Sequence, residues 1–131
     1  MLSVLQIAEA PWDGRVGAGA GSTILLTATT QALVVEALIV VMAAAPDLTD
    51  DPWTGISVED DYGTTPHIFI PAADAVKANL TANAQLAWTG RVYLAVGRSI
   101  QATAIGDDAD ADASITVIAL YRAVVSGGYL A

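Results

Sequence analysis

The sequence contains no cysteine, and it is short of charge, above all of positive charge. Without cysteine there is no disulfide framework, no thiolate nucleophile and no thiolate metal site. Five lysines and arginines stand against fourteen aspartates and glutamates, so the formal net charge is -9. This sign opposes binding to nucleic acid phosphates or to an anionic membrane surface, and we expect neither as a direct partner.

A long apolar run is also absent. The longest, residues 32–45, has 14 residues and is interrupted by Glu36, whereas a membrane-crossing helix needs about 20. Residues 1–10 contain Glu9 but no lysine or arginine, so they lack the charged start of a signal peptide. We therefore interpret the N-terminus as mature sequence and the apolar run as a buried element.

What the sequence does contain is apolar residues, which make up 54% of its 131 positions, with only 15% charged. A chain of this composition is not disordered, and its length predicts one domain with one core. No motif for a cofactor or a reaction is present, so we expect no cofactor and no enzymatic activity.

Short stretches rich in β-branched residues and separated by Gly, Pro and Asp predict a mainly β protein. Residues 99–105 alternate strictly, with Ile100, Ala102 and Ala104 on one face. An acidic turn at 106–112 follows, and residues 114–125 form a second strand, so the two strands are predicted to form a hairpin. Strands at spacings of about 8 to 12 residues predict a sandwich or barrel of about six to eight strands.

Residues 33–42 are apolar on both alternating faces, which is typical of a strand covered on both sides. A helix is the competing interpretation, but five of these ten residues are Val or Ile, which favours the strand. Residues 66–71, bracketed by prolines, predict an edge strand. Residues 72–80 predict one short helix, with Val76 and Leu80 on one face.

The first 22 residues differ in composition from the rest of the chain. Pro11 blocks a helix, and the three alternating glycines Gly17, Gly19 and Gly21 predict a flexible hinge. We therefore expect residues 1–22 to be an extended N-terminal arm that packs on another surface, and residues 23–131 to be a single β-sandwich domain.

One acidic cluster invites a metal interpretation. Asp108, Asp110 and Asp112 alternate like the first oxygen ligands of a calcium loop. However, Ala113 replaces the glycine of that loop and Ala119 its bidentate glutamate, so a solvated acidic hairpin tip is the favoured interpretation.

The chain has one histidine, His67, with no second histidine to complete a zinc site. A catalytic role would require an orienting acid and a nucleophilic hydroxyl, and we expect a surface or hydrogen-bonded histidine instead. The three tryptophans, Trp12, Trp53 and Trp88, fall in predicted loop or arm segments. They are interpreted as anchors on the core, with a subunit interface or a sugar platform as alternatives.

Two strands that are apolar on both faces, 33–42 and 115–125, leave apolar surface that one small sandwich cannot bury. Self-association with closed cyclic symmetry is the simplest way to cover it. Glu36 and Arg122 are the only charges in these two strands and could pair at such an interface. The predicted interface residues are Pro11, Trp12, Glu36, Trp53, Tyr121 and Arg122.

The glycine-rich approach to residues 22–27, the strand 33–40 and the strand 114–122 together resemble small virion proteins of tailed bacteriophages, especially capsid cement or decoration proteins. The resemblance is one of pattern over the whole chain and carries over no functional residue. It implies a jelly-roll-like sandwich and a homotrimer on the outer capsid surface that stabilises contacts between major capsid protein subunits.

A second functional class stays open from the sequence. A carbohydrate- or ligand-binding β-sandwich of a phage tail or appendage would use Trp53 and Trp88, with calcium at Asp108, Asp110 and Asp112.

Overall fold

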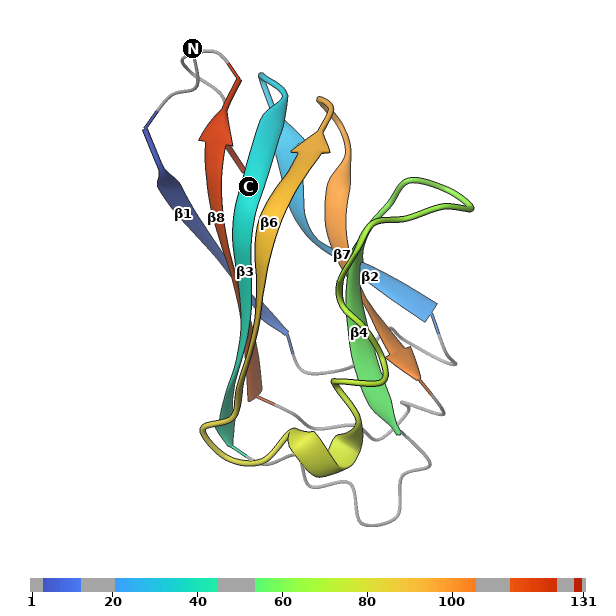
Figure 1. Ribbon diagram of the computed structural model, residues 1–131. Helices are drawn as coiled ribbons and strands as arrows, with labels where there is room; N and C mark the ends of the chain where they lie inside the picture. The colour runs from blue at the N-terminus through green and yellow to red at the C-terminus, as the bar shows by residue number, and fades with distance from the viewer. Residues whose placement is uncertain (1–3, 13–20, 45–53, 106–113, 125–128, 131) are drawn as a thin grey trace.

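The computed structural model describes residues 4–12, 21–44, 54–105, 114–124 and 129–130, and it forms two antiparallel sheets (Figure 1). The first sheet has the order β1 (Gln6–Trp12), β8 (Ser114–Ala123), β3 (Leu33–Ala44), β6 (Gln85–Leu94). The second has the order β5 (Ile68–Ile70), β4 (Gly55–Asp60), β7 (Ser99–Ile105), β2 (Gly21–Thr29), β9 (Tyr129–Leu130). The prediction of a mainly β protein is therefore confirmed.

Successive strands mostly alternate between the two sheets, and of the described strands only β4 and β5 are neighbours both in sequence and in a sheet. The predicted hairpin of residues 99–105 and 114–125 is wrong. β7 pairs with β2 and β4, whereas β8 pairs with β1 and β3 in the other sheet. Side-chain alternation specifies which face of a strand is buried, but it carries no information about which strand lies beside it.

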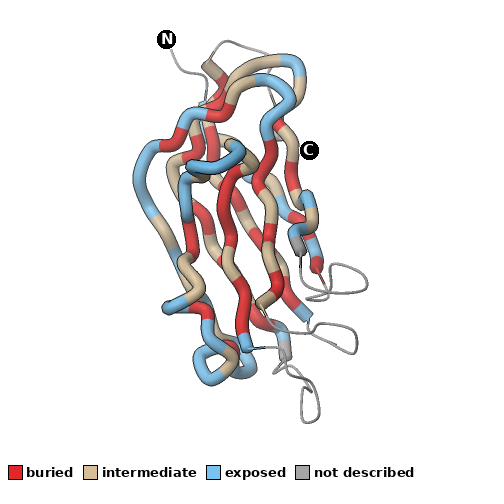
Figure 2. Tube along the Cα trace, turned by 90° about the vertical axis from the view of Figure 1, so that its right-hand side faces the viewer, coloured by how far each residue is buried: buried red, intermediate tan, exposed pale blue. Residues whose placement is uncertain are grey.

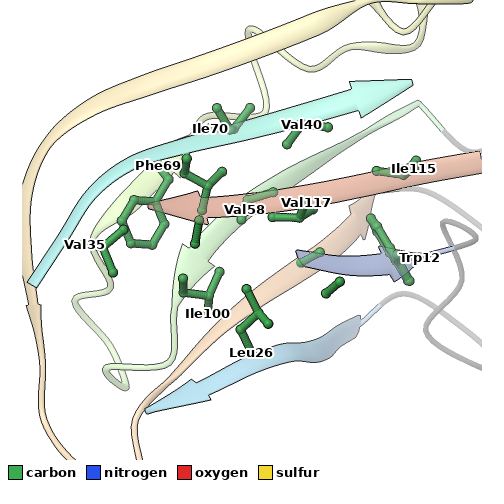
Figure 3. Close-up of a cluster of buried hydrophobic side chains, with 14 of the residues drawn as sticks. Trp12, Leu26, Val35, Val40, Val58, Phe69, Ile70, Ile100, Ile115 and Val117 are labelled. Carbon is green, nitrogen blue, oxygen red and sulfur yellow. The ribbon is translucent and has the colours of Figure 1, made fainter. Parts of the chain in front are cut away.

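The two sheets share one hydrophobic core, and its side chains come from the facing sides of both (Figure 3). Every second residue of β8 is buried, from Ile115 to Ala123, and Figure 2 shows the same alternation along the neighbouring strands. Ile100, Ala102 and Ala104 of β7 are also buried, as their spacing predicts. This two-layer arrangement is what a pleated strand with one apolar face produces.

β3 is a strand, as predicted, but its faces change partway along. Leu33 and Val35 are buried, and after an irregularity in the register at Glu36 the buried set continues with Leu38 and Val40. Strict alternation would have placed Ala37 on the same side as Val35. The extra residue at the bulge shifts the side-chain pattern by one and turns Glu36 and Ala37 to the outer side of the sheet.

The predicted N-terminal arm is not confirmed. All seven residues of β1 pair in register with β8, from Gln6 opposite Tyr121 to Trp12 opposite Ile115. Residues 6–12 and 21–22 of the segment 1–22 therefore belong to the sheets, and residues 13–20, with Gly17 and Gly19 of the predicted hinge, lie outside the described residues.

The helix predicted at residues 72–80 is wrong, because the segment forms turns and one 3-10 helix, η1 (Lys77–Asn79). Beside short bonds within its own turns, its backbone bonds to the start of β4 and the residue before it: the N–H of Ile56 donates to the carbonyl of Ala75, and that of Lys77 to the carbonyl of Thr54. Tertiary pairing here overrides a favourable local helix propensity. Within the described ranges, no helix is long and apolar enough to cross a membrane.

Candidate functional site

The outer side of the four-stranded sheet is unusually apolar. We define it as the apolar face, made of the outward residues Ile7, Val34, Ala37, Ile39, Val41, Ala87, Tyr93, Ile118 and Leu120. At its edges Ile7 and Tyr93 are 65% and 56% exposed. The central residues are half-buried by their own neighbours in the sheet. Apolar side chains are normally found scattered on a surface, and a contiguous set marks an interaction site.

The register shows that these side chains form continuous rows across the strands. Ile7 lies opposite Leu120, which lies opposite Ala37. One step along, Ile118 lies opposite Ile39, which in turn lies opposite Ala87. Directly opposite residues of an antiparallel pair have neighbouring side chains, so the rows make one apolar surface over β8 and β3, which Ile7 extends onto β1 and Ala87 onto β6. Thr89 on β6 and Glu9 on β1 complete the two rows.

The predicted pairing of Glu36 with Arg122 is present, but within one chain. Arg122 Nε donates to Glu36 Oε2 at 3.0 Å, and the side chains are 33% and 22% exposed, respectively. The bulge in β3 places Glu36 on the outer side beside β8, within reach of this arginine. The apolar face therefore carries its own neutralised ion pair.

Two further charged side chains lie on the same outer side of the sheet. Glu9 stands opposite Ile118 on β1, and Arg91 lies on β6 between the outward Tyr93 and the bulge. Both residues are exposed. With two acidic and two basic residues, this side of the sheet has no net charge, in contrast to the chain as a whole.

Of the other predicted interface residues that the structure describes, only Pro11 lies on this outer side of the sheet. Trp12 and Tyr121 face inward and are core residues, 7% and 3% exposed, and the Tyr121 hydroxyl donates to Gln6 Oε1 at 3.2 Å. Pro11 is exposed on the outer side of β1. Trp53 lies outside the described residues. Burial inside one chain is the ordinary role of large aromatic side chains on an inward strand face.

The predicted calcium candidates, Asp108, Asp110 and Asp112, also lie outside the described residues. Within the part of the chain that the structure describes, no group of three or more His, Cys, Asp or Glu side chains is arranged to hold a metal ion.

His67 has a partner that the sequence did not indicate. Its Nδ1 lies 2.6 Å from Oδ2 of Asp60, whose side chain is completely buried. Oδ1 of Asp60 accepts the backbone N–H groups of Tyr62 and His67 at 3.2 and 3.0 Å. The carboxylate thus closes the turn between β4 and β5. These bonds give the pair a structural role in the turn, and among the described residues no serine or threonine hydroxyl is hydrogen-bonded to the imidazole.

Trp88 is part of β6 instead of a loop. Its half-buried ring meets Phe69 edge-on, with centroids 4.9 Å apart, and lies directly over Gly90. A Cβ at Gly90 would approach the indole to 2.6 Å. The indole therefore covers one side of the core, which is the anchoring role predicted for the tryptophans.

The outer side of the five-stranded sheet differs, because beside the exposed Ile24 it carries a connected set of hydroxyl and carboxyl groups. We define it as the polar face: Ser22, Thr27, Ser57, Glu59, Ser99 and Thr103. Ser57 Oγ donates to Glu59 Oε2 at 2.8 Å, and Thr103 Oγ1 donates to the other carboxylate oxygen. Ser22 and Thr103 are joined by a further bond of 2.7 Å. Ser99 and Glu59 are only 2% and 8% exposed, and nothing in the sequence indicated that either would be buried.

With the geometry described, the chain can be compared with known proteins. No protein-family model matches the sequence, and no curated protein is significantly similar to it. In structure, it is similar to a chain in the acidic stable capsid of Helicobacter pylori bacteriophage KHP30, with a TM-score of 0.62 and 15% identity. The similarity covers 100% of this chain and 95% of the capsid chain. Since identity is low, it shows a shared fold.

Two further structures match less well. An exo-beta-1,3-galactanase from Phanerochaete chrysosporium has a TM-score of 0.34 at 12% identity, covering 86% of this chain and 29% of the enzyme chain. A chain of the infectious bursal disease virus Gx strain has a TM-score of 0.31 at 12% identity, covering 98% and 39%, respectively. Both TM-scores are too low to carry an argument about function.

Proposed function

We propose that this chain is a structural protein of a virion: a capsid cement or decoration protein that forms a homotrimer. It would lie on the outer capsid surface and stabilise contacts between neighbouring major capsid protein subunits, without enzymatic activity.

The observation that carries this proposal is the similarity, over the whole of both chains, to a component of a bacteriophage capsid. Because 95% of that chain is covered, the likeness concerns a protein of nearly the same size and not one domain of a larger enzyme. A fold alone does not fix a function. The apolar face supplies the independent support, because a contiguous apolar surface on a small acidic domain is typical of a protein that works by assembly.

A jelly-roll-like topology is part of the proposal. It is supported by the strand orders β1-β8-β3-β6 and β5-β4-β7-β2-β9: apart from the two-residue β9, eight strands form two groups of four, and the chain passes repeatedly between the sheets. Double-sheet jelly rolls of eight strands are common in viral capsids.

No observation on the described residues favours the carbohydrate- or ligand-binding alternative. Trp88, one of its two aromatic candidates, packs against Phe69 and closes the core. Trp53 and the three aspartates of the calcium candidate lie outside the described residues. Binding on a glycan array that is lost in Trp53→Ala would revive this alternative.

The proposal is tested on particles purified from cells in which the gene is expressed from its natural context. Quantitative mass spectrometry should find the chain in intact particles, at a constant ratio to the major capsid protein. Particles made without the gene should lose their contents at a lower temperature, and added purified protein should restore the difference. If the chain is absent from the particles, or if its removal leaves their heat stability unchanged, the cement role is wrong.

A further inference from the structure

We propose that the apolar face is the surface on which copies of this chain pack against one another, turned toward the symmetry axis of the assembly. Self-association is part of the proposed function, so this contact rests on that function for its biological use. The choice of surface is separate, because it follows from the charges and side chains of the four-stranded sheet.

The size of the apolar face is suitable for a stable contact. Four strands spaced about 4.8 Å apart, overlapping for roughly ten residues at about 3.3 Å each, give a face of on the order of 600 Å² in projection. A standard protein interface buries roughly 800 Å² of accessible surface on each partner, and side chains make accessible area larger than projected area. Neighbouring copies that together covered this face would thus meet the usual requirement without help from other surfaces.

The distribution of charge identifies a second copy as the occupant. Glu9 and Glu36 are balanced by Arg91 and Arg122 on this side of the sheet, so the twelve other acidic residues and three other basic residues carry the entire net charge of -9. Two copies of such a chain repel each other overall, and least where the charges balance. A basic partner would instead be attracted to the remainder of the surface. The neutral face is therefore where a like-charged copy approaches at the lowest electrostatic cost.

The internal ion pair makes this face suitable for burial. Glu36 and Arg122 are already joined at 3.0 Å within each chain. An unpaired charge carried into an interface loses its hydration without compensation, whereas a paired charge enters with its partner. At the centre of the face, Ile39 and Ile118 stand side by side on β3 and β8 and would meet the same residues of neighbouring copies.

The contact is tested with a matched pair of substitutions, Ile7→Asp and Ile24→Asp. Ile7 is 65% exposed on the apolar face, and Ile24 is 62% exposed on the outer side of the other sheet. Both replace an exposed strand isoleucine with aspartate, so they add the same charge and carry a similar risk to folding. Ile118→Asp, at the centre of the face, gives a second and stronger probe.

Size-exclusion chromatography with light scattering should find the natural chain at three times its mass of 13.4 kDa. Ile7→Asp should raise the dissociation constant by about tenfold or more, and Ile118→Asp should give monomers. Ile24→Asp should assemble like the natural chain. Circular dichroism and thermal unfolding establish that each variant is folded, and an unfolded Ile118→Asp leaves the comparison of Ile7 with Ile24 decisive.

The inference is wrong if the natural chain is monomeric at about 100 µM. It is also wrong if Ile7→Asp assembles normally, or if Ile24→Asp alone dissociates. These outcomes are distinct from failure of the proposed function: a chain that assembles through the apolar face but is absent from particles overturns the cement role and leaves the contact standing. A dimer that depends on this face would overturn the proposed trimer only.

Discussion

The two outer faces of the molecule contrast sharply although both belong to one small β protein. On the five-stranded sheet, hydroxyl groups of Ser57 and Thr103 surround the carboxylate of Glu59. On the four-stranded sheet, isoleucine, valine and leucine side chains form rows, and the central carboxylate, Glu36, is held by an arginine. The first face satisfies its polar groups within the chain, whereas the second presents apolar surface that only another molecule can remove from water.

This difference indicates which face contributes to the stability of the single chain and which contributes to association between chains. A polar face with satisfied hydrogen bonds contributes to the stability of the isolated chain, so a substitution there should change the free energy of unfolding. An apolar face exposed in the isolated chain contributes little to that stability, so a substitution there should change the dissociation constant instead. The two faces can therefore be separated by measuring the free energy of unfolding and the dissociation constant on the same variants.

The largest effect on unfolding is expected where the five-stranded sheet ends, at Asp60. Asp60→Ala removes a fully buried carboxylate that accepts two backbone N–H groups and the His67 imidazole. Buried donors left without partners should lower the free energy of unfolding by about 3 kcal/mol or more, measured by urea titration. Asp74→Ala, at an exposed carboxylate, is the control and should stay within about 0.5 kcal/mol. Equal effects in the two variants would contradict the structural role of Asp60.

A smaller effect is expected within the polar face itself. Thr103→Val keeps the branched shape but removes the hydroxyl that donates to Glu59 and bonds to Ser22. The nearly buried Glu59 then loses one of two side-chain donors, and unfolding should become easier by roughly 1 to 3 kcal/mol. The same substitution at the exposed Thr89, on the outer side of β6, lacks such a bond among the described contacts and should be close to neutral. A neutral Thr103→Val would mean that water replaces the lost donor.

These same strands show which features of the fold the sequence predicts and which it does not. Alternation at Ile100, Ala102 and Ala104 predicted the buried side of β7, because a pleated strand next to one core must alternate. The bulge at Glu36 was not predictable from alternation, and it reversed the inward and outward sets of β3 from Ala37 onward. The apolar excess predicted self-association but not which face would supply it, since face identity depends on strand partners far apart in the sequence.

Some of the candidate residues could likewise be identified from the sequence, and others could not. Glu36 and Arg122 could be paired from the sequence because they are the only charges in two apolar strands. Asp60 and Glu59 could not be recognised, since a run of acidic residues before a turn is usually solvated, and only the tertiary fold brings donors such as Thr103 and His67 to them.

Salt should separate apolar association from association through charges. Raising sodium chloride from about 0.05 M to about 0.5 M screens the repulsion between copies that each carry a net charge of -9. If the apolar face is the contact, the dissociation constant should fall several-fold, as measured by sedimentation velocity. Weaker association at high salt would indicate that ion pairs between copies, and not the apolar rows, hold the assembly together.

The smallest effect on unfolding is expected at the ion pair of the apolar face. In the monomeric Ile118→Asp background, Glu36→Gln should change the free energy of unfolding by less than about 1 kcal/mol, because the pair is partly exposed to water. In the assembled natural chain the same substitution leaves a charge without its closest counter-charge inside an interface, where such a loss costs about 3 to 5 kcal/mol. A dissociation constant that rises steeply with Glu36→Gln, beside a nearly unchanged monomer stability, would locate the pair inside the contact. Equal small changes in both measurements would place it at the solvent-exposed rim.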